Sequence, residues 1–163
     1  MISKEKVFSE TQSYLDSVNL SVTTTDMERP WGGFFVVDEN DAKKFIDHFF
    51  PELRNTEMLQ GKLSPKMLLV APGKKLSWQY HFRRSEVWKL VKGVAAVVTS
   101  DTDVENETVY LKIGDTITLK KGERHRLVGL NDWGIVAEIW IHTDASNPSD
   151  ENDIVRLQDD FGR

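Results

Sequence analysis

Short runs of apolar and β-branched residues, separated by Gly, Asp, Asn and Pro, follow one another from Lys66 onward and constrain the fold most strongly. Each run suits a single strand, and the residues between the runs favour turns. Regularly spaced strands of this kind are typical of a β-sandwich or barrel. The sequence therefore predicts an all-β fold with strands at Met67–Ala71, Leu76–Phe82, Glu86–Val91, Ala95–Thr99, Thr108–Leu111, Thr116–Leu119, Arg126–Val128 and Ile135–Ile141.

The N-terminal third of the chain has a different pattern. Apolar residues recur at roughly helical spacing in residues 4–18, which predicts a short amphipathic helix. The polar, β-branched run Ser21–Asp26 fits either a linker or an edge strand. Arg29–Gly33 contains Pro and consecutive glycines, which exclude a helix, and Phe34–Val37 fits a strand.

Residues 41–63 separate this first strand from the series of strands that follows. Apolar side chains lie at positions i, i+3, i+4 and i+7 from Ala42 to Phe49, and Pro51 ends the pattern. This periodicity predicts a helix, and we favour a helix packed on the outside of the β-structure. A lid over an open end of the barrel is the alternative.

Two Gly-bounded segments carry the candidate metal ligands. Gln79 and His81 lie two residues apart in a predicted strand, so their side chains point to the same face. Glu86 opens the next run, and His125 follows the turn at Gly122. An amide oxygen, two imidazoles and a carboxylate form a plausible shell for one divalent metal, with Zn²⁺ favoured and Mn²⁺, Fe²⁺, Co²⁺ or Ni²⁺ possible. The alternative is a buried polar cluster whose members satisfy one another.

The spacing G-x5-Q-x-H-x4-E-x6-G, followed by G-x5-K-x-G-x2-H, resembles the two motifs of the cupin superfamily. Within that superfamily, Arg29–Gly32, Ala71–Gly93 and the C-terminal string Glu151–Arg163 resemble the cupin module of type II mannose-6-phosphate isomerases. In bacteria this module often follows a mannose-1-phosphate guanylyltransferase domain. The resemblance implies a double-stranded β-helix, or jelly-roll-like barrel, with a few peripheral helices in the N-terminal third. It covers most of residues 29–163, which we interpret as a single cupin domain with a helical insertion at about 41–63 and an N-terminal helical arm at 1–28.

The same resemblance implies an enzyme that interconverts mannose 6-phosphate and fructose 6-phosphate, or close analogues, through an enediolate. A divalent cation acting as a Lewis acid stabilises the oxygens of such a species. Glu138 occupies the position of a Glu in the similar IEVQ run of the family and is our candidate base. From pattern alone, an outward-facing or salt-bridged Glu138 is about equally compatible with this strand.

The phosphate of a phosphorylated sugar calls for a cation. Arg84 lies two residues before Glu86 and is our first choice, as a catalytic and substrate-binding residue, because extended backbone points both side chains inward. Arg156 and Arg126 come next, and Ser77, in a segment that resembles LSxQxH of the type I isomerases, is a further candidate substrate contact. The polar connection Asp144–Asp153 departs from the shorter one usual in the family.

Composition limits the kinds of partner that we expect this chain to bind. The formal net charge of −5 and the lack of a long basic run argue against nucleic acid, and the absence of Cys excludes disulfides and thiolate metal sites. No apolar segment reaches membrane-spanning length, so we expect a soluble cytoplasmic protein with no membrane partner. We also expect a homodimer formed through sheet faces or edges, with Val87 and Val91 as outward apolar residues.

Other functions remain open at this point. A non-catalytic sugar- or sugar-phosphate-binding cupin would keep the metal and the pocket but lack a working base. A metal-dependent oxygenase is less favoured. The iron of such enzymes usually has more imidazole ligands than this site offers, because Gln79 takes the place of one of them. A guanylyltransferase is disfavoured, because the sequence shows no Gly-rich phosphate loop of that kind.

Overall fold

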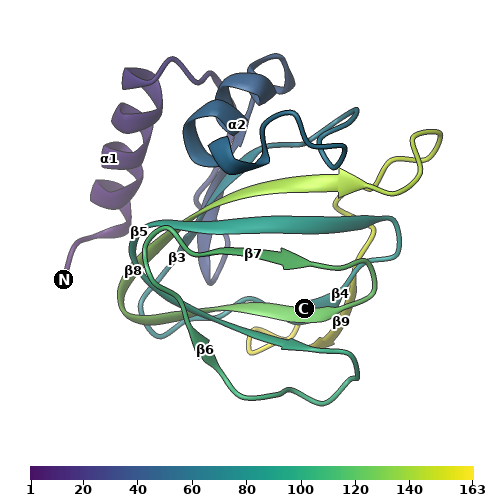
Figure 1. The fold of residues 1–163 in the computed structure, drawn as a ribbon. Coiled ribbons are helices and arrows are strands. Elements are labelled where there is room, and N and C mark those ends of the chain that lie inside the picture. The colour runs from purple at the N-terminus through teal and green to yellow at the C-terminus, as the bar shows by residue number, and fades with distance from the viewer.

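The computed structural model describes residues 1–163 and consists of one bent, nine-stranded antiparallel sheet with helices on one outer side (Figure 1). The sheet does not close into a complete barrel. Its elements follow in this order: α1 Lys4–Ser17, β1 Val22–Asp26, β2 Gly32–Val37, α2 Ala42–Phe49, β3 Lys66–Val70, β4 Trp78–Tyr80, β5 Arg84–Ser100, β6 Val109–Tyr110, β7 Thr116–Leu119, β8 Arg124–His142 and β9 Val155–Gln158; short 3-10 turns at Glu39–Asp41 and Pro51–Leu53 flank α2.

The long strands β5 and β8 pair along their length and divide the sheet into two halves. In the first half, the start of β5 pairs with β7 and the end of β8, and β3, β2 and β1 continue from there. In the second half, the end of β5 pairs with β6 and the start of β8, and β4 and β9 complete it. Each of these two strands was predicted as a pair of separate strands, and that prediction was wrong.

Glycines allow both long strands to bend where the halves meet. Gly93 lies opposite Gly134, and the register shifts on either side of Gly93. Gly93 has φ of +77°, and a Cβ there would lie 1.9 Å from the carbonyl oxygen of Trp133. A glycine in a strand interior that permits such close backbone approach is typical of a bulge or bend.

The two faces of the first half are both buried, because side chains alternate along its strands. Met67 and Leu69 of β3 point outward into a cluster with α1 and α2, whereas Leu68 and Val70 point between the two halves. This double burial explains why β3 is almost continuously apolar. The inner face of the same strands therefore forms one wall of the interior in which the candidate ligands lie.

Helices α1 and α2 cover the outer face. Phe45, Ile46 and Phe49 of α2 belong to the same hydrophobic cluster as Val87 of β5, and no residue of 41–63 lines the central cavity. The position agrees with the outer-helix interpretation rather than with the lid. The structure also corrects the expectation for Val87, which is fully buried beneath this layer and not available to a dimer partner.

The structure also tests two predictions made for the N-terminal region. Within the run Ser21–Asp26, residues Val22–Asp26 form the edge strand β1, paired with β2. The amphipathic helix begins at Lys4, where the Ser3 hydroxyl accepts a hydrogen bond from the Lys6 backbone N–H as an N-cap. No helix of the structure is long and apolar enough to cross a membrane.

Candidate functional site

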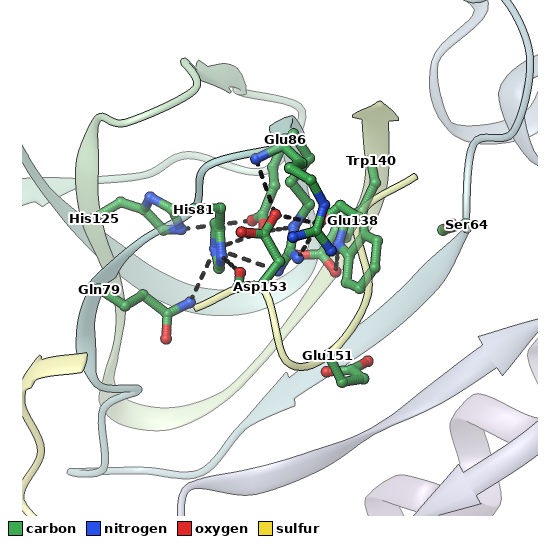
Figure 2. A network of polar contacts seen from close by, with 12 residues as sticks. Ser64, Gln79, His81, Glu86, His125, Glu138, Trp140, Glu151 and Asp153 are labelled. Atoms are coloured by element: carbon green, nitrogen blue, oxygen red, sulfur yellow. Dashed lines mark hydrogen bonds and ion pairs between the residues drawn. The ribbon is translucent and has the colours of Figure 1, made fainter. Parts of the chain in front are cut away.

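The candidate metal ligands come from both halves of the sheet and meet between them. Gln79 of β4 lies directly opposite His125 of β8 in the second half, so both side chains share one face. His81 follows β4, and Glu86 lies in the first half, opposite Trp140. The four side chains that the sequence predicted as ligands are thus gathered in one interior region (Figure 2).

His81, Glu86 and His125 form a compact buried triad. Their nearest ligand atoms all lie within 4.8 Å of one another. His81 Nε2 is 3.1 Å from Glu86 Oε1, His125 Nε2 is 3.6 Å from Glu86 Oε2, and all three side chains are at most 2% exposed. Glu86 Oε2 and His125 Nε2 have no hydrogen-bond partner. Unsatisfied buried atoms are costly, and two of them facing each other fit a site whose missing partner is a cation.

Backbone carbonyls orient both imidazoles. His81 Nδ1 lies 2.6 Å from the Asp153 carbonyl oxygen, and His125 Nδ1 lies 3.0 Å from the Glu123 carbonyl oxygen. A carbonyl can only accept, so each Nδ1 carries a proton, and Nε2 is the nitrogen of each neutral ring that is left to bind a metal. This is the tautomer that a metal requires.

Charge balance in the triad also favours metal binding. Burial, with further contributions from His81 and Arg84, lowers the pKa of His125 to about 4, although the Glu86 carboxylate opposes the shift. Burial would raise the pKa of Glu86, but His81 and Arg84 outweigh it and hold the pKa well below the ordinary value. At neutral pH the site therefore offers a neutral imidazole at His125 and an ionised carboxylate at Glu86, which are ligating forms.

Gln79 and Ser77 form a separate buried contact beside the triad. The Ser77 hydroxyl donates to Gln79 Oε1 at 2.6 Å, and Gln79 Nε2 lies 3.5 Å from His81 Nε2. Rotating the amide by 180° would present its oxygen to the site, and the Ser77 hydroxyl would then accept from the NH₂ group. Ser77 does not line the cavity, and its contact is with Gln79.

Arg84 is buried within the site and its donors are occupied. Its Nε donates to Glu86 Oε1 at 2.9 Å, and its Nη1 donates to the Ser149 hydroxyl and the Asp150 carbonyl. The guanidinium carbon lies 3.6 Å from the centre of the Trp140 ring. Arg84 thus points inward as predicted, but its charge balances Glu86.

Glu138 faces the interior, which resolves the two orientations that the sequence left open. Its two carboxylate oxygens accept from the indole N–H groups of Trp88, at 2.7 Å, and Trp140, at 3.0 Å. Burial, followed by the negative charge of Glu86, raises the pKa of Glu138 to about 8, and Lys66, Arg84 and the Trp88 hydrogen bond oppose the shift. The cavity therefore holds one carboxyl group that stays ionised and one that titrates near neutrality.

A cavity lies between the two halves beside the triad, and Glu86 is the triad residue that lines it. The sequence-predicted residues that line it are Gln79, Arg84, Glu86, Glu138 and Arg156. Arg126 is not among them: it is 1% exposed and donates to the Leu76 carbonyl, to Glu105 and to Gln158. The structure places Arg126 in the framework beside the site and gives it no free donor toward the cavity.

Comparison with known proteins places this chain in a family. Residues 53–159 match the family described as mannose-6-phosphate isomerase C-terminal. The chain belongs to this family. It is 31% identical over 154 residues to the alginate biosynthesis protein AlgA of Pseudomonas aeruginosa, with 91% of this chain and 26% of AlgA covered. It is 29% identical over 142 residues to a mannose-1-phosphate guanylyltransferase of Escherichia coli, with 85% and 23% covered. The chain thus spans about a quarter of the length of these relatives.

Solved structures show the same fold. Oxalate decarboxylase matches 82% of this chain and 30% of its own, with a TM-score of 0.55 and 15% identity. A 7S globulin of Momordica charantia matches 81% of this chain and 34% of its own, with a TM-score of 0.55 and 16% identity. At such identities the likeness concerns the fold alone, and it supports the predicted cupin architecture.

Several side chains in this site were not predicted from the sequence. Lys66 of β3 is buried, lines the cavity and pairs with Glu151. The alternation of side chains along a strand could have identified it, because Lys66 lies on the same face of β3 as Leu68 and Val70. The same alternation identifies Trp88 and Trp140, because each lies two residues after a predicted site carboxylate, Glu86 or Glu138. Asp153 had no local signal, since its contacts depend on how the C-terminal segment folds back.

Proposed function

We propose that this chain is a metal-dependent aldose–ketose isomerase for a phosphorylated hexose of the mannose 6-phosphate/fructose 6-phosphate type, acting through an enediolate. One observation carries the proposal. Glu86 of a metal-compatible His-Glu-His triad lines the cavity, and so does Glu138, a carboxyl group with a pKa near 8. Environments that drive two carboxylates apart in pKa mark acid–base assignments.

A divalent ion held by His81, Glu86, His125 and the Gln79 amide, with Zn²⁺ as our first choice, would supply Lewis-acid stabilisation of the substrate oxygens. Glu138 is the proposed base. Isomerisation requires a group that removes a proton from the carbon beside the carbonyl and returns it to the neighbouring carbon. A carboxylate with a pKa near the working pH suits both transfers. The indoles of Trp88 and Trp140 hold Glu138 in a fixed orientation.

The relatives' names support the substrate class. A mannose-1-phosphate guanylyltransferase acts on a sugar phosphate, and the alginate biosynthesis protein has a role in polysaccharide formation by its name. Because this chain matches only about a quarter of their length, we do not propose the guanylyltransferase activity for it.

Binding requires a side chain to move. The free volume of the cavity is about 80 Å³, which has room for a few water molecules and is smaller than a hexose phosphate. Glu151 lines the cavity, and its side chain is 60% exposed although it pairs with the buried Lys66. We propose that Glu151 swings outward to admit the sugar.

Replacement of Glu138 tests the proposal. Glu138→Gln keeps the shape of the side chain but removes the proton acceptor. We expect metal content and sugar binding to persist while turnover of mannose 6-phosphate falls by about 10²- to 10⁴-fold. Solvent deuterium should no longer enter the carbon beside the carbonyl. Glu52→Gln, on the outer surface next to Lys89, is the matched control and should retain turnover.

The same assay separates the alternatives. Deuterium exchange that persists in Glu138→Gln would exclude Glu138 as the base. Metal-loaded wild-type protein that binds phosphosugars but exchanges no deuterium with any of them would instead be a sugar-binding cupin.

A further inference from the structure

Besides Arg84, three arginines from distant parts of the chain line the same cavity. Arg29 precedes β2, Arg156 lies in β9, and Arg163 is the last residue. None belongs to the metal triad or contacts Glu138. In a chain with a formal net charge of −5, three guanidinium groups in one cavity wall require an explanation.

Strand register places Arg156, which is exposed, on the cavity side of β9. In the antiparallel pair of β4 and β9, Arg156 lies opposite Gln79. Opposed residues of an antiparallel pair project from the same face, so Arg156 shares the inward direction of Gln79. The guanidinium of Arg156 consequently lies on the same side of the sheet as the candidate ligands.

Arg156 is exposed and forms no ion pair of its own. Arg29 pairs with Asp26 at 3.1 Å, and Arg163 pairs with Asp159 at 2.7 Å. Arg156 has neither an ion pair nor a side-chain hydrogen bond, although it lines the cavity. Partial loss of hydration and the positive charge of Arg163 lower its pKa, with Arg29 adding to the effect, although the carboxylates of Asp159 and Glu151 oppose the shift. A bound anion would relieve this repulsion.

The other arginines of the site are already engaged. Arg84 balances Glu86 and stacks on Trp140, and Arg126 is bonded to Glu105 and Gln158. Using either for an incoming anion would break a buried charge contact, which is costly. Arg156 offers its donors without such a loss.

We propose that Arg156, flanked by Arg29 and Arg163, forms the subsite for the phosphate group of the substrate. The inference rests on the proposed function and moves the phosphate contact from Arg84 to Arg156. The guanidinium can donate two parallel hydrogen bonds to a phosphate monoester, and the two flanking arginines add positive charge. The sugar would then extend from this wall toward Glu138 and the metal triad.

Calorimetry with three probes tests the subsite. Mannose 6-phosphate, inorganic phosphate and unphosphorylated mannose are titrated into metal-loaded wild type, Arg156→Gln and Arg156→Lys. Arg156→Gln should weaken binding of the two phosphate-bearing probes by about thirtyfold, as expected for loss of a charge-assisted pair, and leave mannose unchanged. Arg156→Lys should recover part of the loss. Arg54→Gln, on the outer surface next to Asp47, removes the same charge far from the cavity and should bind like wild type.

Each further outcome has a defined meaning. If Arg156→Gln binds mannose 6-phosphate as wild type does, or weakens mannose equally, the subsite is wrong. If Arg84→Gln instead loses phosphate-bearing probes selectively, with unchanged metal content, the phosphate lies at Arg84. If the Arg156 pattern holds but wild type isomerises no phosphosugar, the subsite stands and the proposed isomerase fails.

Discussion

Two carboxyl groups in one cavity have opposite protonation because their neighbours differ. Glu86 faces Arg84 and two imidazoles, whereas Glu138 receives neutral indole N–H groups and senses the negative charge of Glu86. Opposite charges nearby favour ionisation, and burial next to a like charge opposes it. Each residue is therefore suited to a different task, one as a ligand and one as a proton carrier.

The raised pKa of Glu138 makes the stability of the metal-free protein depend on pH. The folded pKa of about 8 exceeds the ordinary value of 4.5, so between these values the folded state holds a proton that the unfolded state releases. The stability that this group contributes is complete below about pH 4.5 and is lost as pH rises through about 8. In urea unfolding at increasing pH, wild type should lose about 1.4 kcal/mol of stability for each pH unit between pH 5 and the folded pKa of about 8. Glu138→Gln lacks this titration, so its stability relative to wild type should rise by the same amount over that range. A difference that does not vary with pH would contradict this prediction.

Metal content depends on the imidazoles of the triad. His81→Ala removes one ligand and leaves Glu86 with one fewer neighbour in a buried site. We expect wild type to hold one divalent ion per chain and the variant to lose most of it, measured by elemental analysis after saturation with Zn²⁺ or Mn²⁺ and desalting. His48→Ala, on the outer helix α2, is the matched control and should retain the ion. A wild-type protein that retains no metal would reduce the triad to a polar cluster.

At the scale of elements, the C-terminal segment before β9 holds the end of β4 in place. The Asp153 carboxylate accepts from the backbone N–H groups of Phe82 and Arg83 and from the Ser149 hydroxyl. Its carbonyl accepts from His81. The polar connection Asp144–Asp153, which departs from the family pattern, thus ends in contacts that fix the tautomer of a candidate ligand.

Asp153→Asn should weaken metal binding without removing a ligand. The amide keeps one acceptor but turns an NH₂ group toward donors, so at least one buried contact is lost. We expect metal affinity to fall by about 10- to 100-fold, as for other groups that orient ligands, with the Tm lowered as well. Asp160→Asn, in an exposed position of the same tail, is the control. Metal affinity equal to wild type would show that the contacts of Asp153 serve folding alone.

The limits of prediction from sequence also lie at this scale. Gln79 and His81 could be paired from their i, i+2 spacing, and Glu86 and His125 were added through the resemblance to the two cupin motifs. The continuity of β5 through Gly93 was not, because a glycine that turns the chain and a glycine that bends a strand have the same local pattern. What distinguishes them is the facing strand, whose Gly134 is distant in sequence. Lys66, Asp153 and the grouping of Arg29 with Arg156 depend likewise on register and on long-range folding.

At the scale of the whole molecule, the bend in β5 and β8 brings the site together. Glu86 and Glu138 belong to the first half of the sheet, and Gln79, His125 and Arg156 belong to the second. The triad therefore exists only when the two halves are held at their native angle. Gly93 is the point where this angle and the site are coupled.

Gly93→Ala tests that coupling, with Gly73→Ala as its matched control. Both glycines have a positive φ, +77° and +70°, so both substitutions carry the cost of a left-handed backbone, about 1–2 kcal/mol. Only at Gly93 does the added Cβ meet backbone, 1.9 Å from the Trp133 oxygen, whereas Gly73 has nothing within 4 Å. We expect urea unfolding to show a clearly larger loss of stability for Gly93→Ala, and its folded fraction to bind Zn²⁺ more weakly than Gly73→Ala does. Equal stability and equal metal affinity of the two variants would mean that the angle between the halves is set elsewhere, because relief of the clash at Gly93 must displace β5 relative to β8.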